Sequence, residues 1–171
     1  MHGTYLEALK GETGALQKGL SRMKRNHVHL ASGLLGEDGV ISGMRHDCSV
    51  YIWVDVHRAI QSGLTFYESD NGVILTSGDS EGFVSSALFS VVIELHDGLD
   101  AKHRAKTARL KLIERLFPGC SRVVAKKLHG GFSDSLVLRT DSYGADGHRR
   151  EPTVTKIDTG KATRLEVKRT R

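Results

Sequence analysis

The chain has 171 residues, of which 39% are hydrophobic and 26% are charged, which indicates a globular protein large enough to bury a core. No stretch approaches the ~20 apolar residues of a membrane span, and the N-terminus lacks the basic and apolar regions of a signal peptide. The two cysteines, Cys48 and Cys120, form no Cys-x-x-Cys pair, which disfavours a disulfide framework and a zinc knuckle. We therefore expect an intracellular protein of the cytoplasm or nucleus.

The first half of the chain combines glycine-bearing turns with short runs of β-branched and aromatic residues. These runs predict strands over residues 28–30, 49–54, 73–76 and 91–95. Helices are expected to be short: one or two turns within 5–18, and a helix over 56–61 with Asp55 as its N-cap and Gly63 as its stop. Many short strands with brief helices indicate an α+β domain.

Residues 100–117 have the most regular pattern in the chain. Apolar side chains recur there at helical spacing, at Ala101, Ala105, Ala108, Leu112 and Leu116. Asp100 stands where a cap is expected, and Pro118 ends the run. The pattern predicts an amphipathic helix that packs on a neighbour with its basic residues in water, or alternatively binds RNA.

Beyond this helix the sequence alternates between β-type runs and polar loops. Strands are predicted over 123–125, 135–140 and 153–157. The loop over 143–151 is expected to be exposed, and the charged tail over 160–171 is expected to be helical or frayed.

The net charge of +5 is unevenly spread along the chain. Residues 1–95 contain 7 Lys and Arg against 11 Asp and Glu, whereas residues 96–171 contain 18 against 9. Such a difference suggests two segments of different origin. The basic half is suited to nucleic acid through phosphate attraction, although a solvated basic face without a partner explains the charge equally well.

Three groups of residues in the first half could carry chemistry. In His2-Gly3-Thr4, the glycine lets a ligand approach the backbone, while the imidazole and the hydroxyl supply directional hydrogen bonds. On a strand, His27 and His29 point to the same face. Arg45 follows a flexible Ser42-Gly43 turn, and a guanidinium in that setting can clamp a phosphate.

Each of these groups also has an ordinary interpretation. Asn71-Gly72 is a turn signal between two β-type runs and is more often a hairpin turn than a site. An isolated arginine is usually solvated. No carboxylate or cysteine joins His27 and His29 at ligand spacing, so we expect no metal.

The order of these groups resembles the C-terminal lobe of the NAD-dependent tRNA 2′-phosphotransferases. The resemblance runs from His2 to about Phe89. It rests on His2-Gly3-Thr4, then Gly-Leu-Ser-Arg-Met-Lys-Arg-Asn-His-Val-His-Leu at 19–30, Gly-Val-Ile-Ser-Gly-Met-Arg at 39–45, and Phe-Tyr-Glu-Ser-Asp-Asn-Gly-Val-Ile-Leu-Thr at 66–76. It implies an ADP-ribosyltransferase-like split β-sheet lobe over residues 1–95. An amphipathic linker helix over 96–121 and a small, basic, β-rich segment over 122–171 would follow.

In that family the 2′-phosphate at an RNA splice junction is transferred to NAD, which yields 2′-hydroxyl RNA, nicotinamide and ADP-ribose cyclic phosphate. The resemblance therefore implies two substrates, NAD and an RNA with an internal 2′-phosphate such as a tRNA. Arg45 matches a catalytic position, where it would neutralise the RNA 2′-phosphate. The residues that match the NAD-binding cleft are His2, Gly3, Thr4, His29, Ser69, Asn71 and Gly72.

The chain also departs from the family pattern. Family members carry an N-terminal lobe that supplies an Arg-His pair and a further Arg, and the resemblance here begins only at His2. Of four catalytic side chains, Arg45 alone is then expected, so catalysis should be incomplete unless a second chain supplies the others. A position that is acidic in protein-modifying relatives of the fold falls near Val73, which argues against protein modification.

A weaker resemblance links residues 128–167 to the nucleotide-binding N-lobe of kinase-like phosphotransferases. Its glycine loop would contain Gly130, Gly131 and Ser133, and Lys156 on a strand would pair with Glu166 on a helix. The loop is shorter than G-x-G-x-x-G, so an ordinary β-hairpin with a basic tail is the alternative. No catalytic aspartate follows, and such a segment could not phosphorylate anything by itself.

Two functions remain open from the sequence. The first is an NAD-dependent RNA 2′-phosphotransferase lobe with incomplete catalysis. The second is a non-catalytic module that binds NAD or RNA, in which the C-terminal segment mediates assembly.

Overall fold

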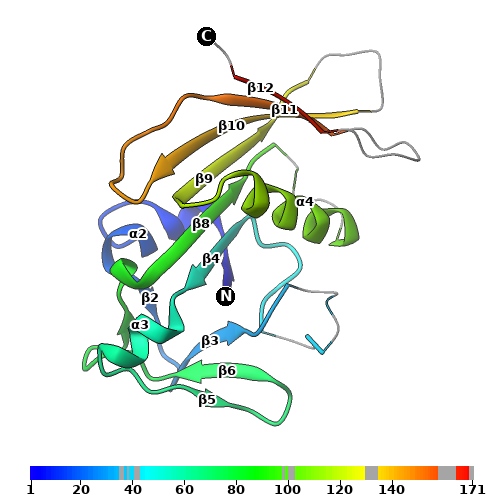
Figure 1. Cartoon of the computed structure of the whole chain (residues 1–171). Coiled ribbons are helices and arrows are strands. Elements are labelled where there is room, and N and C mark those ends of the chain that lie inside the picture. Colours follow the sequence, from blue (N-terminus) through cyan, green and yellow to red (C-terminus); the bar gives the residue numbers. More distant parts are fainter. Residues whose placement is uncertain are drawn as a thin grey trace.

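The computed structural model describes residues 1–34, 37, 39–40, 43–97, 99, 103–129, 135–157 and 165–169, with the backbone alone at 103–106 and 165–169. Its centre is a seven-stranded sheet that runs through both halves of the chain (Figure 1). In spatial order the strands are β1 (His2–Thr4), β4 (Val50–Val54), β8 (Phe89–Leu95), β9 (Cys120–Lys127), β10 (Leu136–Gly144), β11 (Thr153–Ile157) and β12 (Leu165–Arg169). Neighbouring strands are antiparallel, except that β8 and β9 are parallel.

Helix α4 (His103–Leu116) is the crossover that the parallel pair β8–β9 requires. Its Leu110 and Ile113 are buried in one core cluster with Ile93 of β8 and Val123 of β9. The amphipathic helix predicted over 100–117 is therefore confirmed as a helix packed on a sheet, and Asp100 lies outside the described residues. The two halves of unlike charge pair in one sheet, and the division at 1–95, 96–121 and 122–171 stays a prediction.

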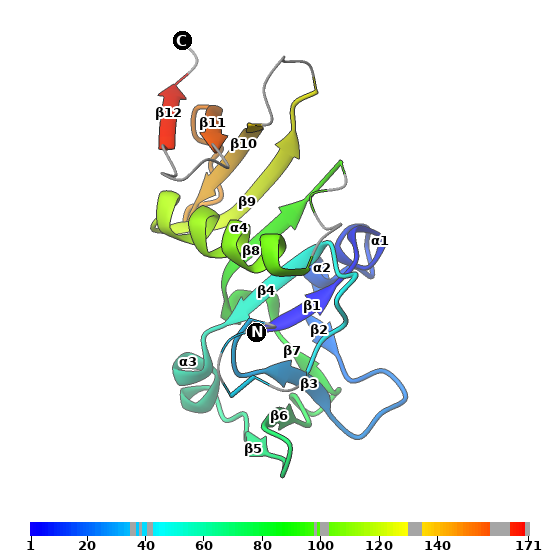
Figure 2. The same ribbon diagram turned by 90° about the vertical axis from the view of Figure 1, so that its right-hand side faces the viewer.

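Two short helices, α1 (Leu6–Leu9) and α2 (Ala15–Lys18), lie on the opposite side of the sheet from α4 (Figure 2). Leu9 and Ala15 share a second core cluster with Ile52 of β4 and Val92 of β8. The sheet is thus buried between helices on both faces along β4 and β8.

Two small sheets complete the first half. One contains β3 (Val28–Ala31), β6 (Val73–Thr76) and β5 (Tyr67–Glu68), and the other pairs β2 (Leu20–Ser21) with β7 (Phe83–Val84). The remaining helical elements are α3 (Val56–Gln61) and the 3₁₀ turn η1 (Ser86–Leu88). These elements confirm the α+β class.

The cap predicted for the helix at 56–61 is present. The Asp55 carboxylate Oδ1 accepts a hydrogen bond from the Arg58 backbone N–H at 3.0 Å, and Gly63 follows the helix with a φ of 96°.

The expectation of a helical or frayed tail is wrong for residues 165–169, which form β12 and pair with β11. Leu165 and Val167 alternate there with charged residues, which is the two-residue period of a strand. A neighbouring strand edge, provided by β11, gives this short segment its backbone hydrogen bonds.

None of the helices in the described part of the chain is both long and apolar enough to cross a membrane.

Candidate functional site

A hollow of about 400 Å³ lies at the β1 edge of the large sheet, where β1, β3 and the loops around residues 22–27 and 43–48 meet. Its lining includes three arginines and three histidines: Arg22, Arg25, Arg45, His2, His27 and His29. Among its described lining residues there is no Asp or Glu. We call this feature the Arg–His hollow. Its side chains suit an anion, because guanidinium groups bind phosphate oxygens with charge-assisted hydrogen bonds.

Hydrogen bonds to backbone carbonyls fix the imidazoles of His2 and His29. Nδ1 of His2 donates to the His29 carbonyl at 2.9 Å, and Nδ1 of His29 donates to the His27 carbonyl at 3.1 Å. Since a carbonyl only accepts, Nδ1 carries the proton in each ring, and in the neutral form Nε2 is an acceptor. Burial lowers the pKa of His2, opposed by its hydrogen bond to His29, so His2 is neutral at physiological pH. Nε2 of such a neutral ring can therefore accept a hydrogen bond from a ligand hydroxyl.

Arg45 stands at the rim beside Tyr5 and Asp47. The Tyr5 hydroxyl donates to Asp47 Oδ1 at 2.9 Å. The hydrogen bond with Tyr5, together with the nearby charge of Asp47, raises the pKa of Arg45, while the Tyr5 hydrogen bond lowers that of Asp47. Arg45 is therefore a permanent, exposed cation at the mouth of the hollow.

Gly3 and Gly43 allow the strands and loops that line the Arg–His hollow to pack closely against one another. A Cβ at Gly3 would lie 2.8 Å from Cys48 Sγ and 2.9 Å from Met44 Cβ. Gly43 has a φ of +126°, and a Cβ there would lie 2.8 Å from the Ala31 Cα. Gly43 thus lets the loop that carries Arg45 rest directly against β3.

The structure brings together four of the residues predicted for the site, namely His2, Gly3, His29 and Arg45. Thr4 follows them on β1, paired with Val50, but does not line the hollow. Sequence reasoning considered His27 only together with His29 and missed Tyr5, Arg22 and Arg25 as individual site residues. The signal for Arg22 and His27 was present in the run at 19–30, whereas Tyr5 reaches the site only through the fold.

Ser69, Asn71 and Gly72 lie in the turn between β5 and β6 and are not among the lining residues. The Ser69 hydroxyl donates to Asn71 Oδ1 at 2.6 Å and accepts from the Val73 backbone N–H at 3.1 Å. Gly72 has a φ of 73°. These contacts shape the hairpin turn, and a role for the three residues in NAD binding stays a prediction.

The nucleotide-binding loop predicted in the second half, with Gly130, Gly131 and Ser133, lies outside the described residues. Lys156 is on β11 as expected, directly opposite Glu166 in the β11–β12 register. Glu166 is on a strand rather than on the predicted helix, which is a correction: the tail adds to the sheet edge instead of packing across it.

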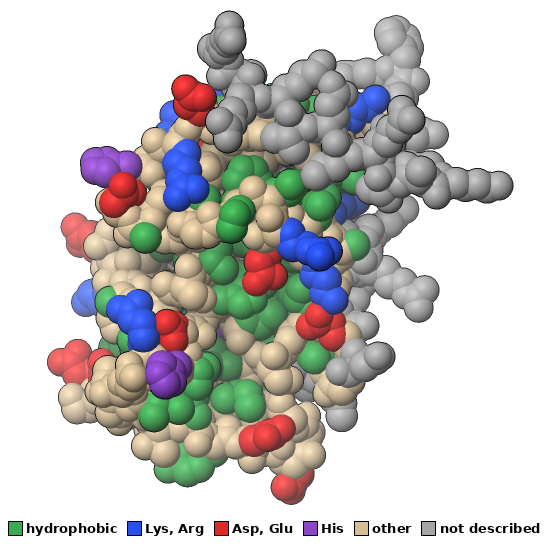
Figure 3. All heavy atoms as spheres, in the orientation of Figure 1, with side chains coloured by type: hydrophobic (Ala, Val, Ile, Leu, Met, Phe, Trp, Pro, Cys, Tyr) green, Lys and Arg blue, Asp and Glu red, His purple; other side chains and the backbone are tan. Residues whose placement is uncertain are grey.

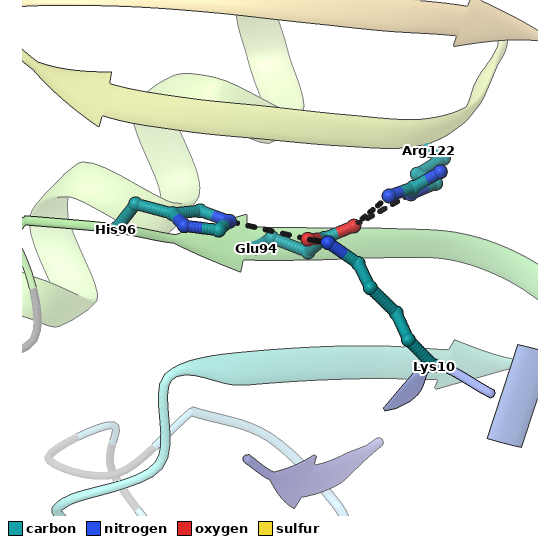
Figure 4. Close-up of polar contacts among 4 residues, drawn as sticks. All are labelled: Lys10, Glu94, His96 and Arg122. Atoms are coloured by element: carbon teal, nitrogen blue, oxygen red, sulfur yellow. Dashed lines mark hydrogen bonds and ion pairs between the residues drawn. The ribbon is translucent and has the colours of Figure 1, made fainter. Parts of the chain in front are cut away.

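A buried ion cluster that sequence reasoning missed surrounds Glu94 on β8 (Figure 4). The Glu94 side chain is 0% exposed. Arg122 of β9 donates to its Oε1 through Nε at 2.6 Å and Nη2 at 2.5 Å, while His96 Nε2 and Lys10 Nζ each lie 3.2 Å from Oε2. Burial alone would raise the pKa of Glu94, but Arg122, with hydrogen bonds from His96 and Lys10, holds it below its ordinary value. The cluster ties three separate segments to one carboxylate.

Comparison with known proteins gives a family for the segment that builds the hollow. Residues 1–78 match the family model described as RNA 2′-phosphotransferase, Tpt1 / KptA family. The resemblance inferred from the sequence is thereby confirmed for this segment.

Individual relatives match more of the chain than the family model does. A putative tRNA 2′-phosphotransferase of Schizosaccharomyces pombe is 47% identical over 121 residues, which is 66% of this chain and 33% of that protein. The tRNA 2′-phosphotransferase 1 of Danio rerio is 46% identical over 90 residues, covering 53% of this chain and 39% of its own length. The tRNA 2′-phosphotransferase of Saccharomyces cerevisiae is 34% identical over 119 residues, which is 68% of this chain and 50% of that protein. The chain thus spans between a third and a half of these relatives.

Proposed function

We propose that the Arg–His hollow takes part in the transfer of a 2′-phosphate from RNA to NAD. The observation that carries this proposal is the lining itself: three arginines and three histidines, with no carboxylate among the lining residues that the structure describes, in the segment that is similar to RNA 2′-phosphotransferases. Phosphoryl chemistry depends mainly on positioning and charge neutralisation rather than on a general base. A hollow of this composition supplies both.

Arg45 is assigned to the RNA 2′-phosphate. Its guanidinium is fully charged and lies at the exposed rim, where a polymeric substrate can reach it. The close packing of Gly43 on Ala31 holds the loop that carries Arg45 against β3. A cation held in a constant position can stabilise the negative charge that develops on the phosphate during the reaction.

NAD is assigned to the interior, against β1 and β3. NAD supplies the carbon that accepts the phosphate and the nicotinamide that leaves. The neutral His2 offers an Nε2 acceptor, which suits a ribose hydroxyl, and His29 lines the same hollow beside it. The ADP-ribosyltransferase-like character of the lobe is part of the same proposal.

The test is incubation of the purified chain with a short RNA that carries one internal 2′-phosphate, with and without NAD. Loss of phosphate is followed by mass spectrometry and nicotinamide release by chromatography, and the two are expected in equal amounts. Arg45→Ala should lower turnover by about a hundredfold, because it removes one charge contact to the reacting group. Arg45→Lys should retain part of it, and Lys18→Ala, an exposed change on α2 outside the hollow, should retain all of it.

The second candidate function, a module that binds NAD or RNA without catalysis, makes a different prediction. Calorimetry would then show saturable binding of NAD while neither product forms. Absence of both turnover and binding would contradict the assignment of the hollow.

A further inference from the structure

One face of the large sheet is left uncovered by helices along β9, β10 and β11. Helix α4 packs on the opposite face, where Leu110 and Ile113 share a core cluster with Val123 and Leu138. The cluster of α1 and α2 reaches the sheet through β4 and β8 and contains no residue of β9, β10 or β11. On the face remote from α4, the helices α1 and α2 therefore cover β4 and β8. No described helix packs on this face over β9, β10 and β11.

This open face carries half of the described Lys and Arg side chains of the second half. In the strand register, Lys126 of β9 lies opposite Arg139 of β10, and Lys156 of β11 lies opposite Val137 of β10. Partners in register point to the same side of a sheet. We define the basic sheet face by its charged side chains and one aromatic ring: Arg122, Lys126, Arg139, Asp141, Tyr143, Arg149 and Lys156. Five of these side chains are cations. Asp141 pairs with Arg139 and Arg149, and the buried Glu94, on the same side of the sheet, holds Arg122.

The α4 side differs in composition. Figure 3 shows that side, with hydrophobic side chains gathered in the middle of the face over the strands below α4. Alternation along β9 separates the two surfaces: Lys126 belongs to the basic sheet face, while Lys127 pairs with Leu138 on the α4 side. The α4 side also carries exposed cations, among them Lys111, Arg115 and Lys127, so the open face is distinguished by the lack of a covering helix among the described residues and by Tyr143 rather than by charge alone.

An aromatic ring and a hollow lie at one end of the basic sheet face. The Arg122 guanidinium lies 5.0 Å from the centre of the Tyr143 ring, and Glu94 fixes that guanidinium from the other side. A hollow of about 390 Å³ opens beside Tyr143, and its lining includes the apolar side chains of Leu16, Ala87 and Phe89. Its composition suits a flat, partly apolar group such as a nucleobase.

We propose that the basic sheet face binds single-stranded RNA, with phosphates along Lys126, Arg139, Arg149 and Lys156 and a base against Tyr143. A charged groove beside an aromatic platform is the combination by which proteins hold single strands without reading their sequence. The surface is distinct from the Arg–His hollow, which lies at the β1 edge, three strands away from β9 in the sheet order. The choice of RNA over DNA rests on the proposed function, but binding here requires neither NAD nor a 2′-phosphate.

The test is fluorescence anisotropy with a labelled, short single-stranded RNA that has no 2′-phosphate, in the absence of NAD. The double variant Lys126→Ala, Arg139→Ala is compared with Lys127→Ala, Arg115→Ala, which removes the same charge from the α4 side. For single strands, each phosphate contact contributes about 0.7 to the slope of log K against log salt. The first double variant should therefore lower the slope by about 1.4, while the second leaves it unchanged.

Tyr143 gives an independent measurement. Tyr143→Ala should weaken binding by about fivefold or more, because stacking of one base is lost, and Tyr143→Phe should bind like the parent chain. A thermal melt of each variant shows whether it is folded.

Equal slopes for the two double variants would overturn the assignment to this face. Tighter binding of a duplex of the same length would overturn the single-strand claim. A single-stranded DNA that binds as well as the RNA supports the surface and removes only the preference for RNA. Loss of 2′-phosphate transfer with retained binding of the plain RNA would contradict the proposed function and leave this inference intact.

Discussion

Positive charge is used in different ways in the two halves of the chain. Residues 1–95 carry more acidic than basic residues, yet Arg22, Arg25 and Arg45 converge there on one hollow. Residues 96–171 carry twice as many basic as acidic residues, and five of the described cations lie along one sheet face. The net charge of a segment therefore does not locate an anion site, because a few arginines grouped by the fold create a locally positive site even in a segment whose net charge is negative.

The two regions are joined through Glu94, and the largest expected effect comes from breaking that joint. Glu94→Gln leaves the guanidinium of Arg122, whose side chain is 26% exposed, without a charged partner, for which a loss of about 3 kcal/mol in the free energy of unfolding is expected, at the lower end of the range for buried pairs. Urea denaturation measures it. Glu81→Gln, an exposed change, should stay within about 0.5 kcal/mol. An equally small loss for Glu94→Gln would mean that the two halves do not depend on this cluster.

The same carboxylate predicts how stability depends on pH. Its pKa is lower in the folded chain than its ordinary value of 4.5, despite burial, because Arg122, His96 and Lys10 stabilise the charged form. A carboxyl of this kind contributes stability above pH 4.5 that is lost as the pH falls through its folded pKa. The difference in unfolding free energy between the parent chain and Glu94→Gln should therefore shrink in acid below pH 4.5. A difference that stays constant there would contradict the depressed pKa.

A smaller effect is expected where the hollow depends on a glycine. Gly43→Ala places a Cβ at a φ of +126° and 2.8 Å from the Ala31 Cα, so about 1–3 kcal/mol of strain is expected. Because the loop that carries Arg45 must move, phosphate transfer should fall by more than the loss of folded protein explains. Gly39→Ala is the control, since it also has a positive φ but no atom within 4 Å of the added Cβ. Normal turnover per folded molecule in Gly43→Ala would mean that the position of Arg45 does not depend on the contact between Gly43 and Ala31.

Sequence reasoning succeeded where the signal was local. The helix predicted over 100–117 and the cap at Asp55 came from spacing and cap chemistry, and the structure bears them out. His2, Gly3, His29 and Arg45 came from the family resemblance; they lie around one hollow, and their roles stay a prediction. Sequence reasoning failed where pairing was non-local. The parallel contact of β8 with β9, which places Arg122 on Glu94, depends on a crossover that no neighbouring residues specify. The tail was mistaken for helix because its strand character comes from the available edge of β11.

The cap of α3 tests the local part of that success. Asp55→Ala removes the acceptor of the Arg58 backbone N–H and should cost about 1 kcal/mol of stability. Asp55→Asn should retain most of it, because an amide oxygen is also a good cap. Thermal unfolding of the two variants distinguishes the cap from a general effect of charge, which both changes remove.

The smallest expected effect on stability concerns Asp141, the surface counterpart of Glu94. Arg149 lies 2.5 Å and Arg139 3.7 Å from its Oδ1, and both arginine side chains are about half exposed. The Asp141 side chain is 13% exposed, but half of each arginine partner is in water, which screens the pairs, so Asp141→Asn should cost less than about 1 kcal/mol, below the loss at Glu94. The same change removes the one carboxylate among the described side chains that define the basic sheet face, so single-stranded RNA should bind more tightly and with a steeper salt dependence. Weaker RNA binding by Asp141→Asn would mean that the ion pairs hold Arg139 and Arg149 in position for the RNA. The surplus of positive charge alone would then not explain the RNA affinity of the basic sheet face.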